Sequence, residues 1–199
     1  MDGVHDMGGT DGFDPVMPVE HPYFTADWER RAFAMLPSLV GQDVINNIPQ
    51  GREVFPKLTV EENLRMGETI NADSDNLLYD EVYDYFSILE ERASQQGGTL
   101  SGGQQQMLAI GRALVGNPDL LVLDEPSEGI QPSIVDQITE DIRAINRDLG
   151  TTVLFVEQNL GVVQEMADRC YAMERGRIVD ELDEAALADE ENIASFLAV

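Results

Sequence analysis

Two adjacent acids, Asp124 and Glu125, follow the apolar run Asp119–Leu123 and stand where a buried strand would end. Open parallel sheets bind their ligands at the carboxyl ends of strands, so both side chains are candidates for chemistry there. One carboxylate can hold Mg²⁺ directly or through water, and the next can orient a water for attack on a phosphate. The alternative is that two acids simply end a strand, and the pair alone favours that alternative.

The signature segment, Ser101–Gln104, is a glycine-rich turn that opens a predicted helix. Backbone N–H groups at a helix N-terminus suit an anion, and glycines let the backbone approach it closely. The alternative is a capped helix after a flexible linker at Gly97-Gly98. The glycine-rich approach, the signature segment, Arg112 and the acids after the strand together favour a functional site over a capped helix.

The elements that must position these residues form an α/β pattern from Gln50 onward. Thr59 and Glu62 have the spacing of a capping box. Gly116 and Gly150 can end the predicted helices Gln104–Val115 and Ser133–Asp148. A strand, a long helix and a second strand predict a crossover with parallel strands. The predicted helices are Asp80–Glu91, Gln104–Val115, Ser133–Asp148, Leu160–Ala167 and the tail Glu184–Val199; the predicted buried strands are Asp119–Leu123 and Thr151–Val156; a hairpin pairs Cys170–Met173 with Arg177–Val179.

The amino-acid composition limits the kinds of molecule that the chain can bind. The 199 residues carry 38 acids against 12 bases, a net charge of -26. Such a chain repels nucleic acid and anionic lipid. The acids are spread along the whole chain, which favours solvation in a salty, halophilic cytoplasm over one acidic binding surface. Cys170 stands alone, so no intrachain disulfide is expected, and a buried structural thiol is favoured.

The first 36 residues differ from the rest. Residues 1–25 are rich in Gly, Asp and Pro, whereas Trp28, Ala32 and Met35 give residues 26–36 one apolar helical face. Residues 37–49 are ambiguous. The N-terminus lacks the pattern of a secretory signal, and no apolar run approaches the ~20 residues that span a bilayer. Any membrane role is therefore expected to be peripheral.

The signature segment and the strand ending in Asp124-Glu125 resemble the signature loop and Walker B strand of ABC-type ATPases. Residues 48–199 resemble the C-terminal two-thirds of an ABC transporter ATP-binding subunit. By that resemblance Gln50 is the Q-loop glutamine, and Ser101, Gly102, Gly103 and Gln104 reach the nucleotide held by the opposing subunit. Asp124 and Gln50 would bind Mg²⁺, Glu125 would be the catalytic base, and Gln158 would stand at the position of the switch histidine.

The subgroup follows from four further stretches. They resemble importers of branched-chain amino acids and their urea-importer relatives, in which glutamine commonly stands where Gln158 does; the stretches are 49–56, 58–64, 125–130 and 156–159. The resemblance implies ATP and Mg²⁺ as cofactors. It also implies a second ABC ATPase subunit, identical or different, and membrane permease subunits as partners. The expected location is the cytoplasm, peripheral on the inner face of the cell membrane.

Residues 1–36 resemble a different protein, the N-terminus of a nitrile hydratase β subunit, through 1–9, 13–16 and 28–35. The predicted organisation is therefore a nitrile-hydratase-like segment at 1–36, a junction at 37–47 and the ABC ATPase part at 48–199. Within that part we expect a helical subdomain at about 58–115 and a Walker B core at about 116–199.

One expected motif is missing from the sequence. A phosphate-binding loop needs Gly-x4-Gly-Lys-[Ser/Thr] between a strand and a helix, and residues 3–10 match only with glycine in place of lysine. No apolar strand precedes them, so we reject this match. The fold class is thus expected to be a truncated α/β P-loop NTPase core that cannot hydrolyse ATP alone. Alternatives are a non-catalytic partner that lends its signature, a fusion remnant, or a nitrile hydratase β-related accessory.

Overall fold

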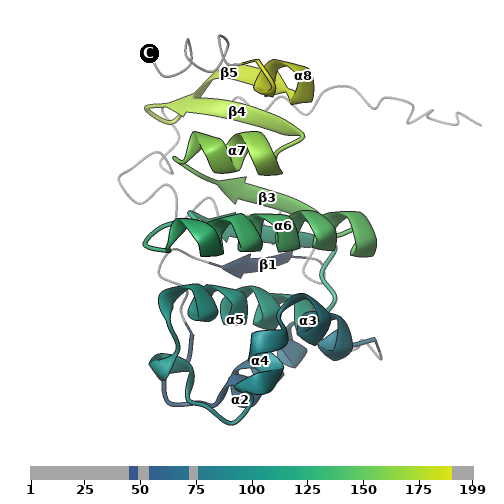
Figure 1. The fold of residues 1–199 in the computed structure, drawn as a ribbon. Coiled ribbons are helices and arrows are strands. Elements are labelled where there is room, and N and C mark those ends of the chain that lie inside the picture. Colours follow the sequence, from purple (N-terminus) through teal and green to yellow (C-terminus); the bar gives the residue numbers. More distant parts are fainter. Residues whose placement is uncertain (1–44, 49–53, 72–75, 190–199) are drawn as a thin grey trace, which may run out of the picture.

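The computed structural model describes residues 45–48, 54–71 and 76–189 (Figure 1). One end of the described part is helical, and the other holds a β-hairpin and a short helix. The helices are α2 Val60–Arg65, α3 Tyr79–Tyr85, α4 Ser87–Glu91, α5 Gly102–Val115, α6 Pro132–Leu149, α7 Leu160–Met166 and α8 Glu184–Leu187, with 3-10 turns at Met66–Asn71 and Gly97–Thr99. The strands are β1 Ile45–Ile48, β2 Leu120–Asp124, β3 Thr152–Val156, β4 Arg169–Glu174 and β5 Arg177–Asp183.

A parallel sheet in the order β1-β2-β3 carries the candidate site. In its register Leu123 lies beside Ile48 on one side and beside Phe155 on the other. Helix α6 connects β2 to β3, which confirms the predicted parallel crossover. The strand β1 falls in the stretch that the sequence left ambiguous. The expectation of an α/β fold with a parallel sheet is confirmed.

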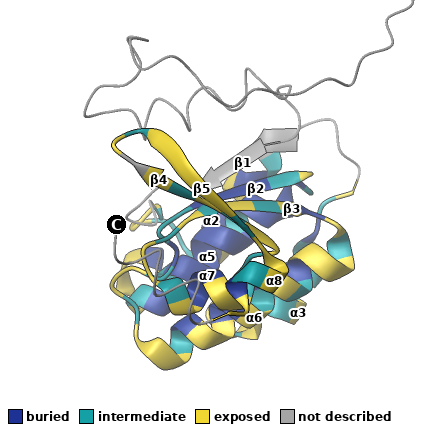
Figure 2. Ribbon diagram, turned by 90° about the horizontal axis from the view of Figure 1, so that it is seen from above, coloured by how far each residue is buried: buried dark blue, intermediate teal, exposed yellow. Residues whose placement is uncertain are grey.

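Helix α5 is the centre of the core. Ten of its fourteen residues are buried, and in Figure 2 it appears as a dark-blue helix behind the strands. One cluster joins Leu64, Val82, Phe86 and Leu89 of the helical end to Leu121 and Leu123 of the sheet and Ile138, Ile142 and Ile145 of α6. Helix α5 thus couples the helical end to the sheet through continuous apolar packing.

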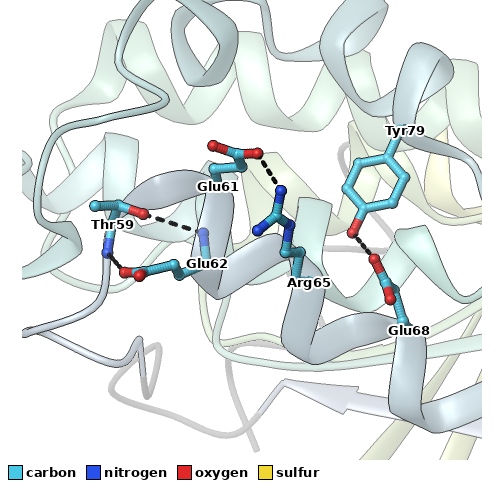
Figure 3. Close-up of polar contacts among 6 residues, drawn as sticks. All are labelled: Thr59, Glu61, Glu62, Arg65, Glu68 and Tyr79. Carbon is cyan, nitrogen blue, oxygen red and sulfur yellow. Dashed lines mark hydrogen bonds and ion pairs between the residues drawn. The ribbon is translucent and has the colours of Figure 1, made fainter.

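The start of α2 matches its prediction (Figure 3). The Thr59 hydroxyl accepts a hydrogen bond from the Glu62 backbone N–H at 3.2 Å, and the Thr59 N–H donates to the Glu62 carboxylate at 2.7 Å. One turn later, Arg65 and Glu61 form an exposed ion pair at 2.6 Å. The Tyr79 hydroxyl donates to Glu68 at 2.5 Å, and burial together with this bond raises the pKa of Tyr79. These contacts fix α2 and the following 3-10 turn against α3.

Two predicted helices differ from expectation. The helix expected over Asp80–Glu91 is broken into α3 and α4 at Phe86, whose backbone leaves the helical region at φ -122° and ψ 64°. The break places the Phe86 ring in the core, where it is 1% exposed. The helix expected over Glu184–Val199 begins as α8 but ends at Leu187, and Ala188 and Asp189 are not helical; residues 190–199 lie outside the described residues. The helix predicted at 26–36 also lies outside them.

The prediction that Thr151–Val156 is a fully buried strand is wrong. Along β3 exposed and half-buried residues alternate, and Leu154 and Val156 are 46% and 40% exposed. Val153 and Phe155 point the opposite way and pack against the core cluster. Because β3 is the last strand of the sheet formed by the described residues, its apolar sequence does not ensure burial on both faces.

The predicted hairpin is confirmed as β4 and β5, which pair antiparallel with a bulge between Ala172 and Met173. Much of it is exposed (yellow in Figure 2). Cys170, expected to be fully buried, is only half-buried, and that burial raises the pKa of its thiol. A short strand pair does not provide enough cover to enclose a side chain completely.

Candidate functional site

The candidate site begins where β2 and β3 end side by side. Asp124 is the last residue of β2 and is half-buried, and Glu125 follows it in the left-handed region at φ 45°. The Glu125 N–H donates to the Val156 carbonyl at 2.9 Å, which continues the sheet by one bond. A residue other than glycine is strained when its φ is positive, and such backbone strain is frequent at functional sites.

Gln158 lies opposite Glu125. Its side-chain Nε2 donates a short hydrogen bond to the Glu125 carboxylate, although the two residues are 33 positions apart. Gln158 is exposed and Glu125 is half-buried, so water can reach the carboxylate. The structure therefore brings together three of the residues singled out in the sequence: Asp124, Glu125 and Gln158.

Glu157 lies beside this pair, and its sequence context alone had suggested no separate role for it. Its carboxylate accepts hydrogen bonds from the backbone N–H groups of Ser127 at 2.8 Å, Gln158 at 3.0 Å and Asn159 at 3.1 Å. The turn after β2 is thereby fastened to the turn after β3. The available signal was the same one that identified Asp124: an acid directly after an apolar strand.

The signature segment lies at the start of α5. The Ser101 hydroxyl accepts from the Gln104 N–H at 3.4 Å, and the Gln104 side chain accepts from the Ser101 N–H at 3.1 Å. This is a capping box, the structural alternative that the sequence left open. Ser101 is nevertheless exposed and Gly102 half-exposed, so both can still meet a ligand at the positive end of a 14-residue helix.

Gly103 has a packing role. It is buried, and a Cβ added there would lie 2.4 Å from Cγ2 of Ile134 and 3.6 Å from Cγ2 of Ile130. The absence of a side chain lets the start of α5 approach α6 and the turn that precedes it. The signature segment therefore lies close to the start of α6 and to the turn after Glu125.

The approach to the signature segment is not the flexible linker expected at Gly97-Gly98. Those residues form an ordered 3-10 turn, and the Gly97 N–H donates to the Leu58 carbonyl at 2.9 Å. A Cβ at Gly98 would lie 2.7 Å from Cβ of Pro56. The glycines serve close packing against the segment before α2, which fixes where α5 begins.

The side chains at the end of β2 supply part of what a Mg²⁺ ion bound to phosphate needs. Mg²⁺ is usually held by one or two carboxylates together with water and phosphate oxygens, and Asp124 supplies one half-buried carboxylate at the strand end. Within the described residues, no cluster of three or more His, Cys, Asp or Glu side chains is placed to hold a metal. Gln50, the second predicted magnesium ligand, lies outside those residues. In the same part of the chain, no helix is long and apolar enough to cross a membrane.

Comparison with known families gives two matches. The ABC transporter family matches residues 38–128. The N-terminal family of the nitrile hydratase β subunit matches residues 1–66, which overlap the first match by part of their length. The two resemblances noted in the sequence are thus both found, and the second extends further along the chain than residue 36.

Curated relatives resemble the larger part of the chain. The chain is 52% identical over 133 residues to the high-affinity branched-chain amino acid transport ATP-binding protein BraG of Pseudomonas aeruginosa, covering 66% of this chain and 57% of that protein. It is 38% identical over 132 residues to the probable branched-chain amino acid transport ATP-binding protein LivF of Archaeoglobus fulgidus, covering 66% and 56%. The chain therefore spans little more than half the length of these relatives.

Solved structures agree on the fold. A nucleotide-free ATP-binding cassette from an ABC transporter superimposes with a TM-score of 0.63 at 27% identity, covering 78% of this chain and 65% of that one. A dimeric cassette in a post-hydrolysis state bound to ADP and phosphate gives a TM-score of 0.62 at 25% identity, covering 72% and 64%.

Proposed function

Because the chain belongs to the family of ABC transporter ATP-binding domains, we propose that it acts as an ATP-binding subunit of an importer for branched-chain amino acids. The two relatives described above are named for branched-chain amino acids, which favours that class of solute over urea. The proposed place is the cytoplasmic face of the cell membrane, bound to permease subunits. The excess of acids fits a salty cytoplasm.

We further propose that the chain works in a mixed pair with a complete ATPase subunit. The sequence holds no Gly-x4-Gly-Lys-[Ser/Thr] motif to cradle a triphosphate, so hydrolysis by the chain alone is not expected. What it offers a partner is the start of α5, with Ser101 exposed and the helix N-terminus directed at solvent. This exposed start of α5 is the observation that carries the proposal.

The residues would divide their roles as follows. Ser101 and the backbone N–H groups of Gly102 and Gly103 would bind phosphate oxygens of a nucleotide held by the partner. Asp124 would hold Mg²⁺, which neutralises phosphate charge when bound. Glu125 would orient a water and accept its proton, and Gln158 would hold the Glu125 carboxylate in place. The last three would act only in a site whose phosphate loop stands beside them on their own side of the pair, and this sequence holds no such loop.

The test uses BraG of Pseudomonas aeruginosa in a variant whose own signature serine is replaced by arginine, so that its homodimers cannot turn over. Mixed with this chain at high salt, the pair is expected to hydrolyse Mg²⁺-ATP, because this chain contributes the signature. Formation of the mixed pair is measured first by analytical ultracentrifugation with nucleotide. The chain alone should show no turnover.

Two variants of this chain make the result specific. Ser101→Arg should abolish turnover of the pair, because a bulky cation would fill the nucleotide side of α5. Glu125→Gln should leave that turnover unchanged, because the working base belongs to the other subunit. Turnover by the purified chain alone that disappears in Glu125→Gln would instead show an autonomous ATPase. A pair that assembles without turnover would contradict the proposal.

A second candidate rests on the match of residues 1–66 to the nitrile hydratase β subunit. It would make the chain an accessory of that enzyme. Retention of a purified nitrile hydratase α subunit by the full chain, and loss of retention after deletion of residues 1–36, would favour this candidate over the importer.

A further inference from the structure

Glu157 connects two turns that are distant in sequence. One carboxylate oxygen accepts from the Ser127 N–H at 2.8 Å, 30 residues earlier in the chain. The second oxygen accepts from the N–H groups of Gln158 at 3.0 Å and Asn159 at 3.1 Å. The side chain is half-buried. Hydrogen bonds to an ionised acceptor are about twice as strong as neutral ones, so this carboxylate is a firm link between the ends of β2 and β3.

Each connected turn holds a part of the candidate site. On the β3 side, the backbone of Gln158 is fixed by Glu157 while its side chain donates to Glu125. On the β2 side, the turn 127–130 is closed by a bond from the Ile130 N–H to the Ser127 carbonyl at 3.4 Å. Cγ2 of Ile130 in turn lies 3.6 Å from the position that a Cβ of Gly103 would take at the start of α5. A path of contacts therefore runs from Glu157 to the signature segment.

Capping of α7 does not account for this arrangement. Asn159 is the N-cap of α7, and its own side chain accepts from the Gly161 N–H at 3.1 Å. The bond from Ser127 reaches a different part of the molecule and adds nothing to α7. A carboxylate is needed for both sets of bonds because each of its oxygens can accept, whereas an amide has only one acceptor.

We propose that Glu157 is a positioning residue that holds Gln158 against Glu125 and fixes the turn 127–130 against the signature segment. Without its carboxylate the Ser127 N–H loses its acceptor and the turn is free to move away from Gly103. Gln158 then loses its backbone restraint, and its amide leaves the Glu125 carboxylate. The kinetic part of the test rests on the proposed function, and the spectroscopic part does not.

The spectroscopic test compares Glu157→Gln with Glu165→Gln, an exposed acid on α7 whose replacement makes the same charge change. In the ¹⁵N-labelled full chain at high salt, the Gln158 side-chain amide resonance, assigned by its loss in Gln158→Ala, is followed together with backbone exchange at Ser127. Because the glutamine side chain keeps one acceptor oxygen, we expect Glu157→Gln to break at least one of the two sets of bonds, seen as a shift of that resonance to the position of a solvated glutamine or as about tenfold faster Ser127 exchange. Glu165→Gln should change neither.

Glu157→Asp keeps the charge but shortens the side chain by one methylene. It should release Ser127, which is the distant partner, while Gln158 and Asn159 stay protected. If Glu157→Gln does not fold, this graded result still decides the question. An unmoved Gln158 resonance and unchanged Ser127 exchange in the folded variants would overturn the proposal.

The kinetic test uses the mixed pair with the signature-deficient BraG variant. Glu157→Gln in this chain should lower kcat about tenfold and leave the KM for ATP within about twofold, because the displaced turn disturbs the signature segment only after nucleotide is bound. An unchanged kcat would overturn the link to the signature segment. Absence of turnover with the unaltered chain would contradict the proposed function, and the spectroscopic result would still decide the role of Glu157.

Discussion

Strands β2 and β3 have nearly the same length and apolar character, yet the structure treats them differently. The three central residues of β2, Leu121, Val122 and Leu123, are all 0% exposed. β3 lies beside it, and its Leu154 is 46% exposed. Val122 and Leu154 are register partners on the same face of the sheet. The difference is therefore one of position in the sheet. In the part of the chain that the structure describes, β2 has a strand on each side, whereas β3 pairs with β2 alone.

An apolar run predicts only part of the environment of a strand. It predicts that a segment can be buried, and continuous apolar runs are typical of strands covered on both faces. It does not tell which neighbour covers the second face. Figure 2 shows the outcome as a change from blue to yellow between the sheet centre and its margin. Substitutions in the two strands should separate these contributions.

The largest expected effect comes from one matched pair of leucines. Leu123→Ala removes a fully buried side chain from the core and should lower the free energy of unfolding by about 2–5 kcal/mol. Leu154→Ala makes the same chemical change at a half-exposed site and should cost less than about 1.5 kcal/mol. Urea unfolding at constant high salt measures both. Equal losses would mean that β3 is covered as well as β2.

Features that depend on neighbouring residues in the sequence were predicted more reliably than the burial of strands by distant segments. Three predictions depend on neighbours in sequence, and all are present: the capping box at Thr59 and Glu62, the helix starting near Ser133 and the hairpin of Cys170–Met173 with Arg177–Val179. The burial of β3 depends on distant segments and was predicted wrongly. The break at Phe86 was missed because the core selects the ring position over helix continuity.

In the candidate site, too, the features set by neighbouring residues were predicted and the contacts between distant residues were not. Asp124 and Glu125 were placed at a strand end by the apolar run before them, and the structure confirms that strand end. The contact of Gln158 with Glu125 could not be derived from spacing, because 33 residues separate them. The role of Glu157 was invisible for a similar reason. Its acceptor oxygens serve Ser127, which only the pairing of β2 with β3 brings near.

A second prediction concerns the close approach of α5 to α6. In the described part of the chain, the outer face of β3 has no such close packing. Gly103→Ala would place a methyl group 2.4 Å from Cγ2 of Ile134. Overpacking of this kind should lower the free energy of unfolding by about 1–3 kcal/mol. The variant Ile134→Ala removes the opposing atom, so the double variant should lose less than the sum of the singles. Strict additivity in this cycle would exclude a direct clash.

A third prediction concerns Asp141 on α6. One of its oxygens is buried without a hydrogen-bond partner, and burial followed by repulsion from Glu140 raises the pKa of Asp141 to about 6. A raised carboxyl pKa means that the folded state binds the proton more tightly than the unfolded state. This contribution to stability therefore grows as the pH falls from about 7 through 6 toward 4.

Asp141→Asn should remove that pH-dependent part. At pH 7 it should stabilise the fold by about 1 kcal/mol, a value reduced for the solvent that screens a half-exposed group. The measurement is the difference between variant and unaltered chain in urea unfolding at pH 5 and pH 7. The difference should be larger at pH 7, and the reverse order would show that the charged form is stabilised by the fold.

The smallest effect is expected on the outer face of β3. Leu154→Gln and Val156→Thr replace side chains that are 46% and 40% exposed, so little apolar area returns to water when the chain unfolds. Each should change the free energy of unfolding by less than about 1 kcal/mol, and threonine should keep the strand preference of valine. Circular dichroism melts at two protein concentrations measure the change. A loss that grows with concentration would mean that this face is covered by a second molecule in solution, and the contrast between β2 and β3 would then belong to the monomer alone.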